Sequence, residues 1–503
     1  MRSVLALGSS WRVQALAGIS LIAAEWPALF GAAQSDPIFT LEATRLPWAD
    51  LLPFLRADVH PPFYYFVAKL WMSLWPGNLP WLRLLSILFA AVAVMACARL
   101  LRGAAPDAAP WASAFLAANG CMLVISAFGR MYALLLLLAI LAWQASVAAL
   151  HEAGLRHQLP AALLICLGLL THHYFVFYLA ALALWLFAVH GGGVVRIVPA
   201  WAVGALVYAA LWGPAAIEQV TGRAQHLAWV QPPKLGQLAL AVGAHLLFVL
   251  AASPLLVFPL LLRRRRENFT WPKESRCAAL AAATAILVPW LVSFWKPIFN
   301  LRFTVIAVPF LAVALAPLGR IANGILPWSA LLLSVAWSWQ SHNDSPCSTA
   351  AAARILALQA SASDFVIFCR LTRKPVEYHW KDMAAPRQSF PAEIDLHPGY
   401  EGRQEEAYLR GEARRLAASL NSRVFVLADT EKPASQILLQ ALAESGFRPR
   451  EPLLACPPRK ATHLYDRLLV FDPPLRQTGS PSGAPPGRES PRPGPAARAY
   501  APR

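Results

Sequence analysis

The chain has 503 residues, of which 57% are hydrophobic and only 14% are charged. Because a soluble domain carries about 25% charged residues, this composition excludes an ordinary soluble protein and predicts a polytopic membrane protein. The net charge of +17 comes mainly from arginines that flank apolar segments. Membrane topology explains this pattern, so we expect membrane lipids and no nucleic acid as partners.

The first apolar run, Val13–Ala33, is interrupted by Glu25 and Pro27. We interpret it as an uncleaved first membrane helix, and a secretory signal peptide is the alternative. A polar loop follows, from Gln34 to about Pro62. Within it, apolar residues recur at helical spacing over Leu46–Leu55, which predicts a short amphipathic helix on the membrane surface.

The loop ends in an unusual stretch, residues 57–65, with the sequence ADVHPPFYY. Paired prolines cannot lie inside a helix, and they push the residue before them, His60, towards extended geometry. We therefore expect Asp58 and His60 on a stiff turn just before a helix that starts with aromatic residues. The alternative is a proline-capped helix entry at which Asp58 and His60 are merely solvated.

Together with the first helix, the later apolar runs predict roughly eleven membrane spans. Leu159–Val189 is too long for one span of about 20 residues, and it carries His172 and His173 near its middle. We therefore expect two spans joined by a tight turn at the two histidines. The alternatives for the pair are a turn cap and a metal ligand pair, although no acid lies nearby in the sequence.

The strongest cytoplasmic signal is the basic run Arg263–Arg266. Placing this basic run on the cytoplasmic side puts the N-terminus in the cytoplasm and the C-terminus outside it. The same assignment brings the first polar loop, Arg130, the histidine turn and Arg302 to the outer face. We therefore expect these polar groups to converge on one side of the membrane.

Residues 1–340 form the predicted membrane domain, and the composition changes after Gln340. Residues 341–472 predict a small α/β domain outside the cytoplasm, and residues 473–503 predict a disordered Pro-rich tail. Cys347, Cys369 and Cys456 lie outside the membrane region, so one disulfide is available but its pairing does not follow from the sequence. The expected strands are Asp364–Arg370, Arg423–Ala428 and Arg467–Phe471, and the expected helices are Ala350–Ala360 and Ser435–Ser445, the second ending at Gly446.

Six segments follow one another along the chain: SDPIFTL at 35–41, DVHPPFYY at 58–65, LRLLS at 82–86, GRMYAL at 129–134, AWVQPP at 228–233 and LRF at 301–303. Together and in this order they resemble the GT-C fold membrane glycosyltransferases of the family-39 type, which include bacterial aminoarabinose transferases and protein mannosyltransferases. The resemblance extends from the first helix to about Leu318. It implies a mainly α-helical, polytopic bundle of GT-C type in a bacterial inner membrane.

This resemblance implies transfer of a sugar from a polyprenyl-phosphate donor to a glycan, lipid or protein acceptor at the outer face. In such enzymes an acidic residue in the first loop serves as the base or positions the acceptor, which here matches Asp36. Many relatives have a second acid next to it, but this chain has Pro37. Glu42 is a candidate replacement. A basic or polar residue before the paired prolines faces the donor phosphate in relatives, and here it is His60.

The chemistry requires the same residue types. A carboxylate must lie near the incoming hydroxyl, for which Asp36 and Asp58 are the candidate catalytic residues. Cations and hydrogen-bond donors must surround the leaving phosphate. The candidate substrate-binding residues are His60, Arg130, Tyr132 and Arg302. For both arginines the alternative is that they anchor helix ends at lipid headgroups.

The sequence shows no Walker motif, dinucleotide-binding fingerprint, HExxH or CxxC pattern. We therefore expect no organic cofactor, and a divalent metal is left open. The alternative function is non-enzymatic, either a transporter or a degenerate relative that only binds a lipid-linked glycan. Pro37, which stands where many relatives have a second acid, motivates the alternative of a degenerate relative. A transporter should show broken helices and ionisable residues near the middle of the membrane.

Overall fold

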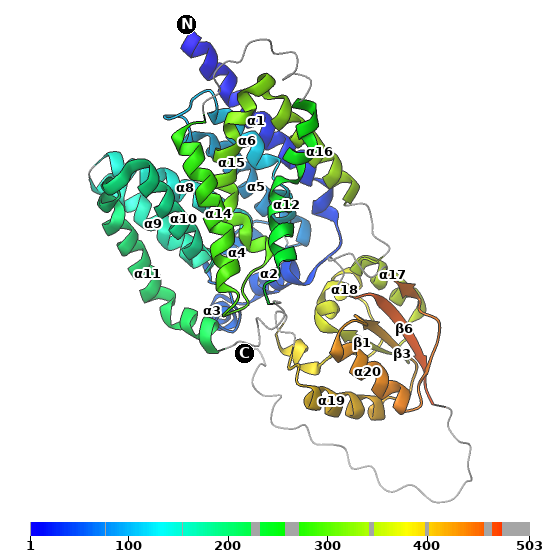
Figure 1. Cartoon of the computed structure of the whole chain (residues 1–503). Coiled ribbons are helices and arrows are strands. Elements are labelled where there is room, and N and C mark those ends of the chain that lie inside the picture. Colours follow the sequence, from blue (N-terminus) through cyan, green and yellow to red (C-terminus); the bar gives the residue numbers. More distant parts are fainter. Residues whose placement is uncertain are drawn as a thin grey trace, which may run out of the picture.

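The computed structural model describes residues 2–75, 77–152, 154–222, 232–256, 271–341, 347–397, 402–456 and 465–474. A helical bundle and a smaller α/β unit lie end to end (Figure 1). Three features used in the sequence analysis lie outside the described residues. They are the basic run Arg263–Arg266, the segment Ala228–Gln231, and the tail beyond Pro474.

Long apolar helices build the bundle. Their bounds are α1 Arg2–Glu25, α5 Leu79–Cys97, α6 Ala109–Ala117, α7 Gly120–Ser126, α8 Tyr132–His151, α9 Leu155–Thr171, α10 Phe175–His190, α11 Val198–Ile217, α12 Leu235–Ala252, α14 Lys273–Val292, α15 Val308–Leu315 and α16 Ile325–Ser341. The helix α1 packs against α5, α6 and α16. Its Ala17, Leu21 and Ala24 are fully buried, so this segment is part of the bundle.

Among the described residues, seven segments are long and apolar enough to cross a membrane, against the eleven spans predicted. The difference has physical causes. The run 109–126 breaks into α6 and α7, which are bent by 62°, and α9 has 17 residues. The helices α10 and α11 follow each other within one apolar segment of 47 residues, Phe175–Thr221. The protein is a multi-pass membrane protein.

Short helices cover one end of the bundle, and the expected amphipathic helix is among them. They are α2 Ser35–Arg45, α3 Trp48–Arg56 and α4 Phe63–Ser73. In α3, Leu51 and Leu55 are fully buried, whereas Trp48 is half-exposed. The helix α4 begins directly after Pro62, as the paired prolines predict. The chain leaves α9 after Thr171 and enters α10 at Phe175, so the predicted turn at His172 and His173 is confirmed.

The α/β unit contains a mixed sheet with the strand order β2-β1-β3-β6-β4, and β5 also pairs with β6. Strands β2, β1 and β3 are parallel, whereas β6 runs antiparallel to β3. The strand bounds are β1 Phe365–Cys369, β2 Arg387–Phe390, β3 Val424–Ala428, β4 Arg448–Pro449, β5 Leu454–Ala455 and β6 Arg467–Asp472. The helix bounds are α17 Thr349–Gln359, α18 Arg373–His379, α19 Glu406–Ser419 and α20 Pro433–Glu444.

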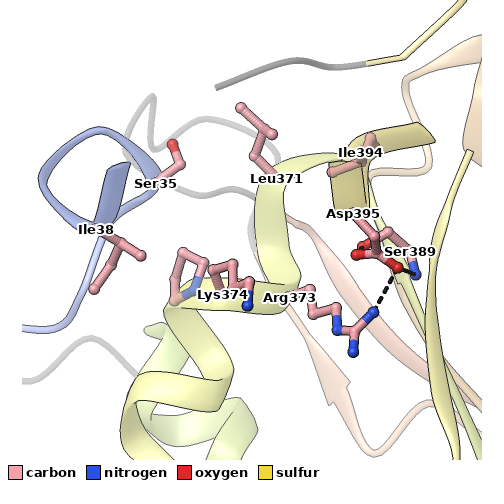
Figure 2. A pocket seen from close by; sticks show the side chains of 9 residues that line it. Ser35, Ile38, Leu371, Arg373, Lys374, Ser389, Ile394 and Asp395 are labelled. Atoms are coloured by element: carbon pink, nitrogen blue, oxygen red, sulfur yellow. Dashed lines mark hydrogen bonds and ion pairs between the residues drawn. The ribbon is translucent and has the colours of Figure 1, made fainter. Parts of the chain in front are cut away.

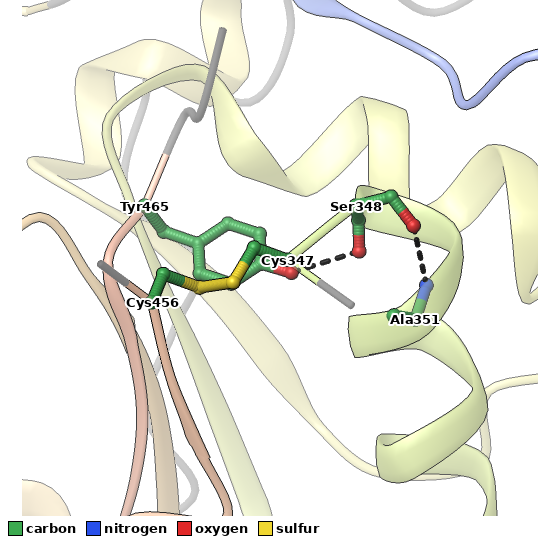
Figure 3. Close-up of a disulfide and its surroundings, with 5 residues drawn as sticks. All are labelled: Cys347, Ser348, Ala351, Cys456 and Tyr465. Atoms are coloured by element: carbon green, nitrogen blue, oxygen red, sulfur yellow. Dashed lines mark hydrogen bonds between the residues drawn. A yellow bond between two sulfur atoms is a disulfide. The ribbon is translucent and has the colours of Figure 1, made fainter. Parts of the chain in front are cut away.

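All three expected strands and both expected helices of this unit are present. Gly446 follows α20 at φ +83°, the left-handed conformation that favours glycine after a helix. Cys347 forms a disulfide with Cys456, which ties the start of the unit to the segment before β6 (Figure 3). The third cysteine, Cys369, is buried in β1 with a free thiol.

The α/β unit is attached to the same end of the bundle as α2. The backbone N–H of Ala33 donates to Nε2 of His379 at 3.0 Å, and Thr349 Oγ1 donates to the Ala33 carbonyl at 2.6 Å. The backbone N–H of Leu79 donates to the Tyr378 hydroxyl at 3.1 Å. The two bonds to Ala33 hold the chain that leads from α1 into α2, and the bond to Leu79 holds the start of α5. The unit therefore lies on the same side as Asp36.

Candidate active site at the α2 end of the bundle

Asp36 lies in the first turn of α2, where the helix dipole favours a negative charge. It forms an ion pair with Arg302. Arg302 is positioned by Asn300, whose side chain accepts the Arg302 backbone N–H at 3.0 Å. Partial burial would raise the pKa of Asp36, but the charges of Arg302 and Arg130 outweigh burial and lower it. Asp36 is therefore ionised at neutral pH, and 35% of its side chain stays exposed.

Asp58 and His60 form a second acidic and basic pair, on the turn that precedes α4. The distance between His60 Nδ1 and Asp58 Oδ2 is 2.9 Å. Because an ionised carboxylate only accepts, this bond places a proton on Nδ1. The Tyr65 hydroxyl also donates to Asp58 at 3.3 Å. Burial would raise the pKa of Asp58, but its interactions with His60 and Arg130 lower it. Both residues are buried, which contradicts the solvated alternative.

Arg130 connects the two carboxylate regions. Its Nη1 donates to the Asp36 carbonyl at 3.4 Å and to the Tyr65 hydroxyl at 3.0 Å, while its Nη2 lies 3.3 Å from His60 Nδ1. Nη1 also donates to Thr40 Oγ1 at 3.3 Å. Only 3% of Arg130 is exposed. A headgroup anchor would reach out of the protein, so that alternative is wrong for Arg130. Arg302 likewise points at Asp36.

Tyr132 and His172 complete the cluster through ring contacts. Tyr132 is the first residue of α8, and its ring centroid lies 5.9 Å from that of His172. The His172 ring in turn lies 5.4 Å from the His60 ring and 5.0 Å from the Phe303 ring. All six residues named as site candidates therefore lie in one neighbourhood.

Glu42 lies outside this cluster, and the expectation that it replaces the missing second acid is not supported by its position. It pairs with Arg45 at 2.8 Å on the partly exposed side of α2. The second carboxylate near Arg130 is Asp58 instead. Within the described ranges, no group of three or more His, Cys, Asp or Glu side chains is arranged to hold a metal ion.

Sequence reasoning missed Thr40 as a partner of Arg130. Thr40 follows Asp36 by four residues, so on a helix the two side chains share a face, and this spacing was the available signal. Phe39 was missed as well. Its ring centroid lies 5.3 Å from the Arg130 guanidinium, so the cation is held between polar and aromatic partners.

The α/β unit closes over one flank of α2. The pocket in Figure 2 is lined by Ser35 and Ile38 of α2 and by Arg373, Lys374 and Asp395 of the α/β unit. Its volume is about 10 Å³. Arg373 Nη1 donates to Asp395 at 2.5 Å within the α/β unit. A cavity of that size holds about one water molecule, so the two units pack closely beside Asp36.

No protein-family model matches the sequence, and no curated protein matches it significantly. Solved structures do match. The chain is similar to ArnT from Cupriavidus metallidurans in the apo state, with a TM-score of 0.53 and 11% identity over 92% of this chain and 98% of that one. It is also similar to the same ArnT bound to undecaprenyl phosphate, with a TM-score of 0.50 and 12% identity over 95% and 99% of the two chains.

An oligosaccharyltransferase from Archaeoglobus fulgidus aligns at a TM-score of 0.49 and 12% identity, over 93% of this chain and 75% of that one. At these identities the likeness concerns architecture, and it extends over nearly the whole chain, including the α/β unit. The helical bundle with its surface helices and C-terminal sheet therefore has the GT-C fold.

Proposed function

We propose that this protein is a membrane glycosyltransferase that moves a sugar from a polyprenyl-phosphate donor to a glycan, lipid or protein acceptor at the outer face of the membrane. The observation that supports it most is that one partly exposed carboxylate, Asp36, lies among three basic side chains, Arg130, Arg302 and His60. Similarity to an ArnT structure that binds undecaprenyl phosphate supports the lipid-phosphate donor.

In this mechanism the acceptor hydroxyl attacks the anomeric carbon of the donor sugar. The bond between that carbon and the phosphate oxygen breaks, and the phosphate leaves with the electron pair. Asp36 takes the hydroxyl proton as general base, and its exposed third is where an acceptor can approach. Arg130 and Arg302 stabilise the charge of the leaving phosphate. Attack from the face opposite the phosphate inverts the anomeric centre.

The ion pair between Arg302 and Asp36 couples donor binding to this step. While Arg302 is paired with Asp36, it lowers the pKa of the carboxylate and makes it a weak base. A donor phosphate competes for the same guanidinium, because its oxygens accept charge-assisted hydrogen bonds from arginine as a carboxylate does. When Arg302 turns to the phosphate, the pKa of Asp36 rises and the carboxylate can accept a proton. The base is thus strengthened only when donor is bound.

Asp58 has a positioning role rather than a catalytic one in this proposal, which revises its assignment as a catalytic candidate. It is 6% exposed and accepts from both His60 and Tyr65. The hydrogen bond from His60 Nδ1 fixes the orientation of the ring, and in the imidazolium form Nε2 carries a second N–H that can donate to the donor phosphate. Tyr132 contributes its ring to the wall of the same site.

Two features support an extracytoplasmic position for the α/β unit, and the family resemblance implies a bacterial inner membrane as its location. The unit contains the Cys347–Cys456 disulfide, and disulfides persist mainly in oxidising compartments. It also lies at the Asp36 end of the bundle. A reporter that is active only outside the cytoplasm, fused near Ser361, should be active. Activity of a cytoplasmic reporter there would reverse the topology.

A transporter is the second candidate, because α6 and α7 form a helix broken by a 62° bend. At the break, however, Asn119 caps α7 by accepting the backbone N–H groups of Cys121 and Met122 at 3.0 and 3.2 Å. Its amide also donates to the His245 carbonyl at 3.2 Å. The Asn119 side chain at this break is hydrogen-bonded within the protein, so the break offers no substrate site.

The test is transfer of a radiolabelled sugar from a polyprenyl-phosphate donor in proteoliposomes, comparing Asp36→Asn with the unmodified protein. Asparagine keeps the size but cannot take the proton, so the rate should fall by roughly 10²- to 10⁴-fold with donor binding retained. Glu42→Gln is the matched control, since it removes a carboxylate from the same helix outside the cluster. Normal transfer by Asp36→Asn would move the base elsewhere. Absence of transfer with every donor tried would favour the degenerate alternative.

A further inference from the structure

His172 lies in the tight turn between α9 and α10 and is 4% exposed. The backbone N–H of Tyr174 donates to its Nδ1 at 3.1 Å. A ring nitrogen that accepts a hydrogen bond carries no proton, so the proton of the neutral imidazole is on Nε2. Burial lowers the pKa of His172 well below its usual value, with the charges of His60 and Arg130 acting in the same direction. The side chain is therefore a neutral N–H donor.

This donor is buried without an acceptor among the residues that the structure describes. Buried polar groups are nearly always paired, and each exception needs an explanation. The ring of His172 contacts those of His60 and Tyr132, which places the unpaired N–H inside the candidate site. Nε of Arg130 is likewise buried without a partner in the described ranges. Two unpaired donors in one cluster indicate a site built for an acceptor atom.

We propose that His172 binds the donor phosphate, with its Nε2–H donating to a phosphate oxygen beside Arg130. The assignment rests on the proposed glycosyltransferase function and adds a substrate-binding residue to it. A metal ion is not the occupant at this nitrogen, because binding a metal through Nε2 would move the proton to Nδ1, against the N–H of Tyr174. A phosphate oxygen accepts such a donor without any change in the ring.

The neighbouring His173 supplies a matched control. Its Nδ1 lies 3.1 Å from the Tyr208 hydroxyl and its Nε2 lies 3.0 Å from Gln219 Oε1, so both ring nitrogens already have protein partners. Replacing His173 removes internal hydrogen bonds but no ligand contact. Comparing variants at His172 with variants at His173 therefore separates a loss of ligand binding from a general disturbance of the turn.

The experiment measures binding of undecaprenyl phosphate, without sugar, to the full-length protein in detergent. His172→Phe keeps an aromatic ring against Phe303 but removes the donor, and it should weaken binding by roughly 10- to 100-fold. His172→Gln restores an N–H near the same position and should recover most of the affinity. His173→Phe should bind normally once folding is verified by thermal unfolding. If His172→Phe does not fold, His172→Leu against His172→Gln gives the same contrast.

Equal binding of undecaprenyl phosphate by the unmodified protein and His172→Phe would overturn this assignment and leave the proposed function standing. Weakening seen only with the sugar-bearing lipid would also overturn it, because the contact would then be to the sugar. Failure of the unmodified protein to bind any polyprenyl phosphate would instead contradict the proposed function, and the assignment with it.

Discussion

Two buried polar clusters in the membrane domain differ in a way that indicates their roles. In the first cluster, His245 of α12 contacts Asn119 at the α6–α7 break and Thr304 in the segment before α15. Both ring nitrogens of His245 have partners: Nδ1 lies 3.2 Å from Asn119 Oδ1, and Nε2 lies 2.8 Å from Thr304 Oγ1. The cluster around Arg130 contains several formal charges and two donors, Arg130 Nε and His172 Nε2, that lack partners in the described residues. A closed neutral network holds helices together, whereas an open charged one is built for a ligand.

The largest effect that separates the clusters is expected for Arg130→Lys. Lysine keeps the charge but loses the planar fork that contacts Tyr65 and Thr40 and faces His60. Without this fork, at least two charge-assisted hydrogen bonds to the lipid phosphate should be lost, so affinity for undecaprenyl phosphate should fall roughly 100-fold. Titration of the detergent-solubilised protein with the lipid checks this. Unchanged affinity would mean that the open cluster does not hold the phosphate.

A smaller loss is expected for Asp58→Asn, which leaves Arg130 intact. The amide accepts more weakly than the carboxylate, so the His60 ring is held less firmly and its Nδ1 proton is no longer fixed by a charge. Donor affinity should fall roughly tenfold, as for one ordinary hydrogen bond. Because Asp58 does not take the acceptor's proton, transfer at saturating donor should stay near normal. A collapse of saturated transfer, with affinity preserved, would make Asp58 the base.

In the closed network, Asn119→Ala should affect stability and not binding. It removes the cap of α7 and the bond to the His245 carbonyl, which costs about 0.5–2 kcal/mol for the cap. A lower thermal midpoint with unchanged affinity per folded protein is the expected result. Altered lipid affinity would show that the two clusters act together.

The smallest effect concerns the α/β unit. Partial burial would raise the pKa of Glu377, but its bonds to Arg387 and Arg373 lower it. A carboxylate with a lowered folded pKa stabilises the protein above its ordinary pKa, and this contribution is lost as the pH falls through the lowered value. Glu377→Gln should therefore reduce stability at pH 7 by about 1 kcal/mol and flatten the loss of stability below about pH 4. Thermal unfolding at several pH values measures both.

The sequence predicts the parts of the fold that have strong local signals. The paired prolines before Phe63, the length of Leu159–Val189 and the apolar strand residues 424–428 each correspond to an observed boundary or element. The helix α19 was missed because it is highly charged. Its buried Leu409, Ala413 and Leu416 do follow helical spacing, so the signal was present but narrow.

The contacts of the candidate site were less accessible from sequence. Asp36 and Arg302 are 266 residues apart, and only the tertiary packing that places α2 beside the segment of Arg302 brings them together. His172 was correctly expected in a turn, where its Nδ1 accepts the backbone N–H of Tyr174. The proposed role of its Nε2 follows only from burial beside His60 and Tyr132, and no local sequence pattern reveals that burial.

The most direct test of the open cluster is a structure of the full-length protein with undecaprenyl phosphate, determined by cryo-electron microscopy. We predict that the phosphate contacts Arg130, His60 and His172, and that Arg302 has turned from Asp36 to the phosphate. A phosphate bound elsewhere, with the pair of Arg302 and Asp36 intact and the donors of Arg130 and His172 still unoccupied, would contradict the account.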